Sequence, residues 1–450
     1  MAEGVREGKE PGPWQRARAR ASGTPDKRNR YADGLRAASI VVVVIGHWLM
    51  AAPTVESGVR FTLSDLLHVA PWTQWLTWIF QVMPIFFVVG GYANAASWES
   101  ARASGQGYDA WLSRRLQRLV RPVVPFVLAW CALAFVARWA GLGQGVVRSG
   151  SQAAFVPTWF LAVYVLVIVL APGMFRIWRR YGMASFWALL MGAAAVDAVS
   201  RVPGLDWVQW ANYGFVWLAI HQLGYAWWDG TFSEPARALS FAMGGAAALI
   251  VLKGLASYPV SMVTVPGDTA ANSAPPTLAL LALGVTHTGL AMAVEAPARR
   301  LLRRETLWEV VVFVNGVIMT LYLWHATVMV LVVGVAEWPG GIGLRFVPDT
   351  ALWWATRIPW LMILLAGLAG FLALFGPFEA QPMAPPKAPP AWRSVLGALA
   401  LCAGLVALSA TGIGATNPLG FRTGRVILTL GGAYLVAVVS APWRRAGASR

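Results

Sequence analysis

Long apolar stretches separated by short polar segments dominate this chain. A run of about 20 apolar residues can cross the hydrocarbon core of a bilayer as a helix. Twelve runs fit this description, although the first, third, fifth and twelfth are short: near 37–52, 75–97, 122–139, 155–175, 183–199, 207–228, 238–256, 276–294, 308–334, 351–375, 395–413 and 426–441. The pattern predicts an all-α protein that crosses a membrane many times.

Composition and charge agree with that prediction. The chain is 57% hydrophobic and 12% charged, whereas about 25% of a soluble domain is charged. Most of the 36 Lys and Arg residues fall in alternate connecting segments, starting with the N-terminal one, and such segments usually face the cytoplasm. Both termini are therefore predicted to be cytoplasmic, and the net charge of +16 needs no nucleic-acid partner.

The chain divides by composition into five parts. Residues 1–30 are basic, rich in Gly, Pro and Ala and without an apolar core, so a disordered cytoplasmic tail is predicted. Residues 31–378 hold ten spans, and 379–394 form a proline-rich linker. Two extra spans follow in 395–441 with almost no polar residue, which predicts a packing appendage. Residues 442–450 would be a second cytoplasmic tail.

The first apolar run begins near Arg36 and contains His47 eleven residues later. In an α-helix the two residues would share a face and lie about 16 Å apart along the axis. A histidine at membrane depth usually has a function and faces a polar cavity. Imidazole can accept the proton of an attacking hydroxyl, so His47 is a candidate general base. Arg36 is either a charge that sets topology or an anion clamp at the mouth of that cavity.

A second basic cluster comprises Arg114, Arg115, Arg118 and Arg121, directly before Pro122. Arg114, Arg118 and Arg121 lie along one helical stripe, and Arg115 and Arg118 are i, i+3 neighbours. The cluster is either a juxtamembrane helix on anionic lipid or a phosphate-binding surface, because arginine makes two-point contacts to phosphate. A phosphorylated donor such as coenzyme A would suit it.

Several other positions carry candidate chemistry. Gly90 and Gly91 allow either close helix packing or passage of a substrate. The segment with Tyr322, Trp324 and His325 is either a set of interface aromatics or an acceptor site in the outer half of its span. Four further residues inside spans are expected to be structural: His221, His287, Cys131 and Cys402. Arg357 is expected either to snorkel outward or to line the outer vestibule. No metal-binding motif is found, so no metal site is predicted.

Taken together, these motifs resemble the acyltransferase 3 family of integral-membrane O-acyltransferases. Asp33-Gly34-Leu35-Arg36 with His47 is similar to the first-helix signature of that family, and Arg115-Leu-Gln-Arg118 to its R-x-x-R block. Three further blocks occur in order, over a match that covers residues 30–375: Phe86-Phe87-Val-Val-Gly90-Gly91-Tyr92, Thr158-Trp159-Phe160-Leu161 and Tyr322-Leu323-Trp324-His325. Met83-Pro84 and Gly90-Gly91 replace an acidic residue and a serine-glycine pair that are frequent in the family.

The resemblance implies a ten-helix bundle, here followed by two extra transmembrane helices in a bacterial plasma membrane. It also implies transfer of an acyl group, commonly acetyl from cytoplasmic acetyl-CoA, to a hydroxyl of a glycan, lipid or secondary metabolite. His47 would be the essential histidine, as base or acyl relay. Arg36, Arg115 and Arg118 would bind the acyl-CoA co-substrate, and no permanently bound cofactor is expected. The alternatives are a proton-coupled transporter or lipid flippase, and an inactive scaffold.

Overall fold

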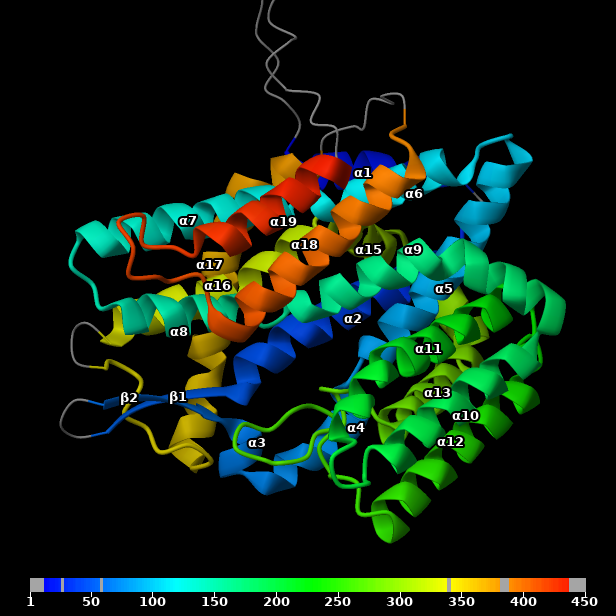
Figure 1. Ribbon diagram of the computed structural model, residues 1–450, viewed down its shortest axis with the longest axis horizontal. Coiled ribbons are helices and arrows are strands. Elements are labelled where there is room, and N and C mark those ends of the chain that lie inside the picture. Colours follow the sequence, from blue (N-terminus) through cyan, green and yellow to red (C-terminus); the bar gives the residue numbers. More distant parts are fainter. Residues whose placement is uncertain (1–11, 26–27, 57–59, 338–340, 381–387, 437–450) are drawn as a thin grey trace, which may run out of the picture.

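The protein, seen in a computed structural model, is a bundle of helices with one small β-hairpin (Figure 1). The structure describes residues 12–25, 28–56, 60–337, 341–380 and 388–436. About 77% of the chain is helical, which confirms the all-α class. The hairpin pairs β1 (Ala51–Glu56) with β2 (Arg60–Asp65) in antiparallel register.

The helices follow one another with short connections. Their bounds are: α1 Pro13–Ser22, α2 Arg30–Met50, α3 Leu66–Val69, η1 Pro71–Leu76, α4 Thr77–Phe80, α5 Met83–Ala103, α6 Tyr108–Val120, α7 Val123–Trp139, α8 Gln144–Phe155, α9 Thr158–Tyr181, α10 Met183–Val199, η2 Asp206–Ala211, α11 Asn212–Trp228, α12 Pro235–Leu255, α13 Leu278–Ala293, α14 Glu295–Leu301, α15 Glu305–Gly316, α16 Ile318–Glu337, α17 Ala351–Ala380, α18 Ala391–Thr411 and α19 Thr423–Val436.

Many of these helices can cross a bilayer. Within the described residues, eight stretches are long and apolar enough, or nine if the bent pair α13–α14 counts as one span. Two further apolar helices, α10 and α19, are shorter. Each of the twelve predicted runs contains a helix, but a count of ten plus two spans is not confirmed. The protein is therefore an integral membrane protein with at least eight candidate spans.

Helix α2 passes through the centre of the bundle and leads into the hairpin (Figure 1). Its start is fixed by Asn29, whose side chain accepts hydrogen bonds from the backbone N–H groups of Tyr31 and Ala32, the usual N-cap interaction. Packing against α5, α15 and α16 buries Ile40, Val44 and Trp48. Because α2 continues unbroken to Met50, Arg36 and His47 belong to one helix, as predicted.

Helices α5 and α11 approach closely through two glycines. A Cβ on Gly91 would lie 2.0 Å from the carbonyl oxygen of His221, and a Cβ on Gly224 would lie 2.1 Å from that of Val88. Both distances are shorter than any tolerated contact, so only glycine fits at these positions. Gly90 instead faces the Tyr164 ring, 2.8 Å from where its Cβ would be. The paired glycines therefore serve close packing, the first of the two interpretations offered for them.

The disordered tail predicted over 1–30 contains a helix in the structure. Residues Pro13–Ser22 form α1, which packs against α15. Ala17 and Ala21 are buried, and the side chain of Arg18 pairs with Glu309 at 3.0 Å. Composition alone did not reveal this helix, because its buried face is made of small alanines between arginines.

The predicted ninth span, 308–334, is two helices in the structure. Helix α15 ends at Gly316 and α16 begins at Ile318. The backbone N–H groups of Met319 and Thr320, at the start of α16, donate to the Glu379 carboxylate at 3.0 and 2.9 Å. A carboxylate is favourable at a helix N-terminus, so Glu379 stabilises the break.

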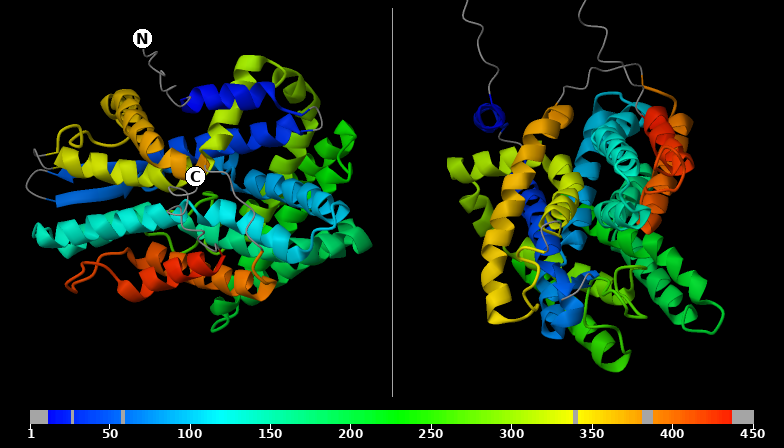
Figure 2. Two further views of the ribbon diagram at one scale, coloured as in Figure 1. Left: turned by 90° about the horizontal axis from the view of Figure 1, so that it is seen from above. Right: turned by 90° about the vertical axis from the view of Figure 1, so that its left-hand side faces the viewer.

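The C-terminal pair packs on the bundle. Helices α18 and α19 contact each other, and α18 also contacts α8 and α9; Figure 2 shows the pair, in orange and red, along the cyan helices α6 and α7. Residues 381–387 of the predicted linker over 379–394 lie outside the described residues, while α17 continues to Ala380 and α18 begins at Ala391. The tail over 442–450 also lies outside the described residues.

Candidate active site

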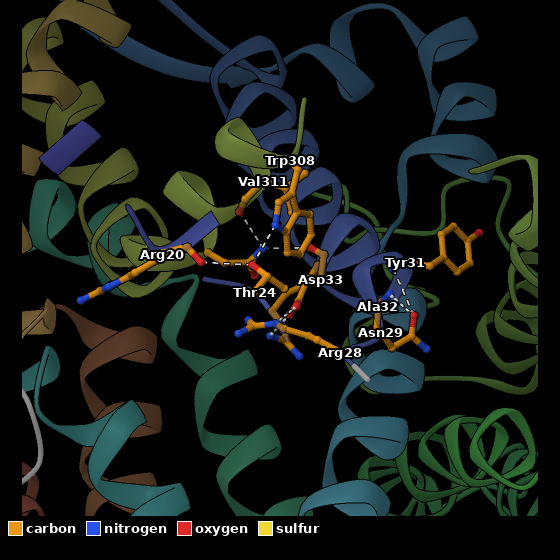
Figure 3. Close-up of polar contacts among 11 residues, drawn as sticks. Arg20, Thr24, Arg28, Asn29, Tyr31, Ala32, Asp33, Trp308 and Val311 are labelled. Carbon is orange, nitrogen blue, oxygen red and sulfur yellow. Dashed lines mark hydrogen bonds and ion pairs between the residues drawn. The ribbon is translucent and has the colours of Figure 1, made fainter. Parts of the chain in front are cut away.

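The first half of the candidate site lies near the start of α2. Arg36 pairs with Asp33 at 3.3 Å and keeps 22% of its side chain exposed. Asp33 also accepts a hydrogen bond from Arg28 at 2.6 Å, and Figure 3 shows this contact beside the Asn29 cap. A carboxylate shared between two arginines holds them in place and leaves net positive charge at this end of α2.

Helix α6 adds two more arginines to the same end. Arg115 and Arg118 are close enough to Arg36 to interact with it electrostatically. Arg118 is exposed, while Arg115 is partly buried. Three guanidinium groups from two helices thus converge on one place. The carboxylates of Asp33 and Glu379 offset part of this charge. A bound phosphate would offset more of it, and phosphate oxygens match the geometry of arginine.

A chain of buried polar groups positions Arg115. Its Nη2 donates to Oδ1 of Asn94, and Nδ2 of Asn94 lies 3.0 Å from Nε2 of His221. Because Oδ1 of Asn94 accepts from the arginine, its Nδ2 must donate to His221. The proton of His221 therefore sits on Nδ1, for which the described part of the chain provides no partner. His221, expected to be structural, is linked to the arginine cluster through one amide.

The other two predicted donor residues are arranged differently. Arg114 is exposed and donates to Gln106 on the connection before α6. Arg121 follows the last turn of α6 and is partly exposed. The arginine cluster of this site is defined here as Arg36, Arg115 and Arg118.

The second half of the site is a pair of histidines on α2 and α16. Nδ1 of His47 lies 2.8 Å from Nε2 of His325, and the two rings are nearly parallel. The indole Nε1 of Trp48 donates to the His325 carbonyl oxygen at 2.9 Å, and that of Trp360 donates to the Trp48 carbonyl oxygen at 3.1 Å. These two indole hydrogen bonds thus fix the C-terminal end of α2 against α16 and α17.

The hydrogen bonds of His325 determine which nitrogen of His47 is free. Nδ1 of His325 lies 2.8 Å from the carbonyl oxygen of Tyr322, which can only accept, so this nitrogen carries a proton. A second proton would make His325 a buried cation, and no carboxylate of the described residues interacts with it, so this state is unfavourable. Its Nε2 therefore accepts from Nδ1 of His47. Nε2 of His47 is left as an unprotonated base.

The two histidines differ in accessibility. His325 has no exposed surface, whereas His47 is partly exposed. His47 is thus the member of the pair that a second molecule can reach, and His325 can act only through it.

The two aromatic residues beside His325 are packing residues. The hydroxyl of Tyr322 donates to the backbone carbonyl of Pro157 and the ring is buried. Trp324 is also buried and stacks on Phe375 with centroids 4.0 Å apart. His287, as expected, has a structural contact, with Nε2 2.9 Å from the Trp78 carbonyl oxygen.

Sequence reasoning missed the partners that hold the site together. Nothing in the sequence paired His47 with His325, because the two lie 278 residues apart. Asn94 was not singled out, although a polar amide inside the apolar run 75–97 was a signal that could have found it. Cys131 and Cys402 are free and buried.

Comparison with known proteins identifies one related family. A family model described as an acyltransferase domain, that of the acyltransferase 3 family, matches residues 29–337. No curated protein and no solved structure matches the chain. The matched range contains α2, α5, α6 and α16, and hence both the arginine cluster and the histidine pair.

Proposed function

Because the chain belongs to the acyltransferase 3 family, we propose that it transfers an acetyl group from acetyl-CoA to a hydroxyl group of a glycan, lipid or secondary metabolite. Family membership makes it a membrane acyltransferase that moves groups other than amino-acyl groups. We propose, beyond family membership, the identity of the donor, the acyl group and the acceptor, and the roles of the residues.

One observation carries the proposal: helix α2 contributes a residue both to the arginine cluster and to the histidine pair. Arg36 and His47 are eleven residues apart, about 16 Å along the helix axis. Acyl-CoA has its phosphates at one end and its thioester at the other. Such a molecule could place its phosphates on the arginines and extend its acyl group towards His47.

The arginine cluster would bind the phosphates of the donor. Arg118, which is exposed, would meet a phosphate first. Arg115 would be held by Asn94 and Arg36 by Asp33, so their guanidinium groups would need little rearrangement when the donor arrives. A pre-positioned site loses less entropy on binding. In the predicted orientation this end faces the cytoplasm, where acyl-CoA is made.

His47 would act as the general base. Its Nε2 would take the proton of the acceptor hydroxyl while that oxygen attacks the thioester carbonyl carbon. The tetrahedral intermediate would then collapse, the carbon–sulfur bond would break, and the CoA thiolate would take the proton back from His47. His325 would stabilise the imidazolium that forms in between, because its Nε2 accepts the Nδ1 hydrogen. If His47 is instead an acyl relay, the same lone pair on Nε2 would attack the thioester carbonyl carbon and the carbon–sulfur bond would break to release the CoA thiolate. The acceptor hydroxyl would then attack the acyl-imidazole, which frees Nε2, and its proton would pass to the thiolate.

Two assays test the proposal. Acetyl-CoA, but not free acetate, should protect the purified protein against heating, since a ligand that binds only the folded state raises its stability. Membranes containing the protein should also transfer label from acetyl-CoA into a lipid, glycan or metabolite fraction. A protein that is stabilised by neither compound and transfers no label would support the transporter or scaffold alternative. Mass spectrometry of surface glycans, lipids and secreted metabolites, with and without the gene, would identify the acceptor.

A further inference from the structure

Arg357 on α17 is a buried cation without an anionic partner among the described residues. Only 6% of the residue is exposed. Within the same residues its Nε and Nη1 have no hydrogen-bond partner, and Nη2 makes one long contact to the Thr356 hydroxyl at 3.4 Å. None of the salt bridges found in the described part of the chain includes Arg357. Burying an arginine without an acceptor is unfavourable, so its retention calls for a reason.

The guanidinium group of Arg357 lies over the rings of two tryptophans. The central carbon of Arg357 lies 4.1 Å from the ring centroid of Trp353 and 5.3 Å from that of Trp360. Both rings are buried. A cation–π contact is electrostatic and uses none of the N–H donors as hydrogen bonds to a polar acceptor. Nε and Nη1 of Arg357 are therefore available for a carboxylate or phosphate.

The position of Arg357 connects it to the histidine pair. Trp360, which contacts Arg357, donates to the Trp48 carbonyl oxygen at 3.1 Å, and Trp48 donates to the His325 carbonyl oxygen at 2.9 Å. Trp48 also follows His47 directly on α2. The indole of Trp360 therefore lies between Arg357 and the C-terminal end of α2. That end bears His47, the candidate base, and is opposite the end with the arginine cluster.

A second positive site at this end is not needed for the donor. The phosphates of the donor have the arginine cluster, eleven residues earlier along α2. A cation beside the histidine pair suits the other substrate, which must approach His47 with its hydroxyl. We propose that Arg357 binds an anionic group, a carboxylate or a phosphate, of the acceptor. The acceptor would then be an acidic glycan, lipid or metabolite, an inference that rests on the proposed function.

Thermal unfolding of the detergent-purified full chain tests this directly. The protein is saturated with CoA, so that the arginine cluster is occupied, and then mixed with glucuronate, glucose 1-phosphate or neutral glucose. At least one of the two anions should raise the unfolding midpoint of the wild type by a few degrees, and glucose should not. A response to glucuronate alone points to a carboxylate on the acceptor, and a response to glucose 1-phosphate alone points to a phosphate.

Variants assign the effect to Arg357. Arg357→Gln should lose the response to the anions, and Arg357→Lys should keep part of it, because lysine retains the charge but not the two-point geometry. Arg357→Lys also keeps the test decisive if Arg357→Gln does not fold. Arg201→Gln is the matched control: Arg201 also stacks on an aromatic ring, that of Tyr258 at 4.9 Å, but is exposed, and its loss should leave the response unchanged.

The inference is overturned if neither anion stabilises the wild type. It is also overturned if Arg357→Gln responds as strongly as the wild type or, where that variant does not fold, if Arg357→Lys does so. Its failure can be told apart from failure of the proposed function. Protection by acetyl-CoA depends on the arginine cluster, and Arg357→Gln should retain it. A wild type that responds to acetyl-CoA but to neither anion would keep the acyltransferase proposal and reject an acidic acceptor.

Discussion

Replacing His325 by alanine isolates the contribution of the histidine pair. In the proposed reaction His47 becomes an imidazolium when it takes the acceptor proton, and its Nδ1 hydrogen points at Nε2 of His325, 2.8 Å away. A hydrogen bond to a charged group contributes about 1.5–3 kcal/mol. At about 1.36 kcal/mol for each tenfold change in rate, His325→Ala should lower kcat about 10- to 150-fold.

The expected loss is smaller than that for His47 itself. Removing a general base typically lowers the rate by about 10²–10⁴-fold, and His325→Ala leaves that base present but less well oriented. His325→Gln should recover part of the activity, because the amide oxygen can accept the same hydrogen. The KM for acetyl-CoA should stay near the wild-type value in both variants, since His325 does not contact the arginine cluster.

The assay is transfer of label from acetyl-CoA in membranes containing equal amounts of each variant. Tyr322→Phe is the matched control on the same helix: it removes a buried hydroxyl that bonds to the Pro157 carbonyl and should leave kcat within a few-fold of wild type. Wild-type kcat in a folded His325→Ala protein would refute the reasoning. So would a loss in Tyr322→Phe as large as that in His325→Ala, because it would show that packing of α16, not the imidazole, is responsible.

Three further predictions concern donor binding and packing. Arg118→Ala should raise the KM for acetyl-CoA about 10-fold or more with little change in kcat, as expected for a lost charge-assisted contact, whereas exposed Arg114→Ala should not; equal KM values in the two variants would contradict the cluster. Asn94→Leu should also raise that KM, because it removes the side chain that holds Arg115; an unchanged KM would make Asn94 a packing residue only. Gly91→Ala should lower the unfolding midpoint markedly, because its Cβ would lie 2.0 Å from a carbonyl oxygen of α11, and overpacking of this kind costs about 1–3 kcal/mol; Gly244→Ala, with open space around its Cβ, should not, and equal midpoints would show that α5 and α11 can separate.

The fold was predictable where hydrophobicity decides it. Every predicted apolar run contains a helix, because in a bilayer an apolar segment must satisfy its own backbone hydrogen bonds. The break at Val317 was not predictable, because the carboxylate that stabilises the new helix start comes from Glu379, 60 residues away. Helix α1 was missed because its buried face consists of Ala17 and Ala21 rather than of large apolar residues.

The candidate site was predictable residue by residue but not as an arrangement. Helical periodicity placed Arg36 and His47 on one face, and a short spacing made Arg115 and Arg118 neighbours. The contact between His47 and His325 joins helices far apart in the sequence, and periodicity within a helix carries no information about which helices meet. For the same reason Tyr322 and Trp324, next to His325 in sequence, were grouped with an acceptor site although the structure buries both in packing contacts.

The proposed reaction depends on the free Nε2 of His47, and a comparison of the wild type with His47→Ala tests that dependence most directly. Single-turnover transfer of label from saturating acetyl-CoA is measured for the wild type and His47→Ala, with protection against heating by acetyl-CoA measured on the same samples. The rate of transfer should be about 10²–10⁴-fold lower in His47→Ala, and protection by acetyl-CoA against heating should be unchanged. Transfer at the wild-type rate by a folded His47→Ala protein would contradict this dependence.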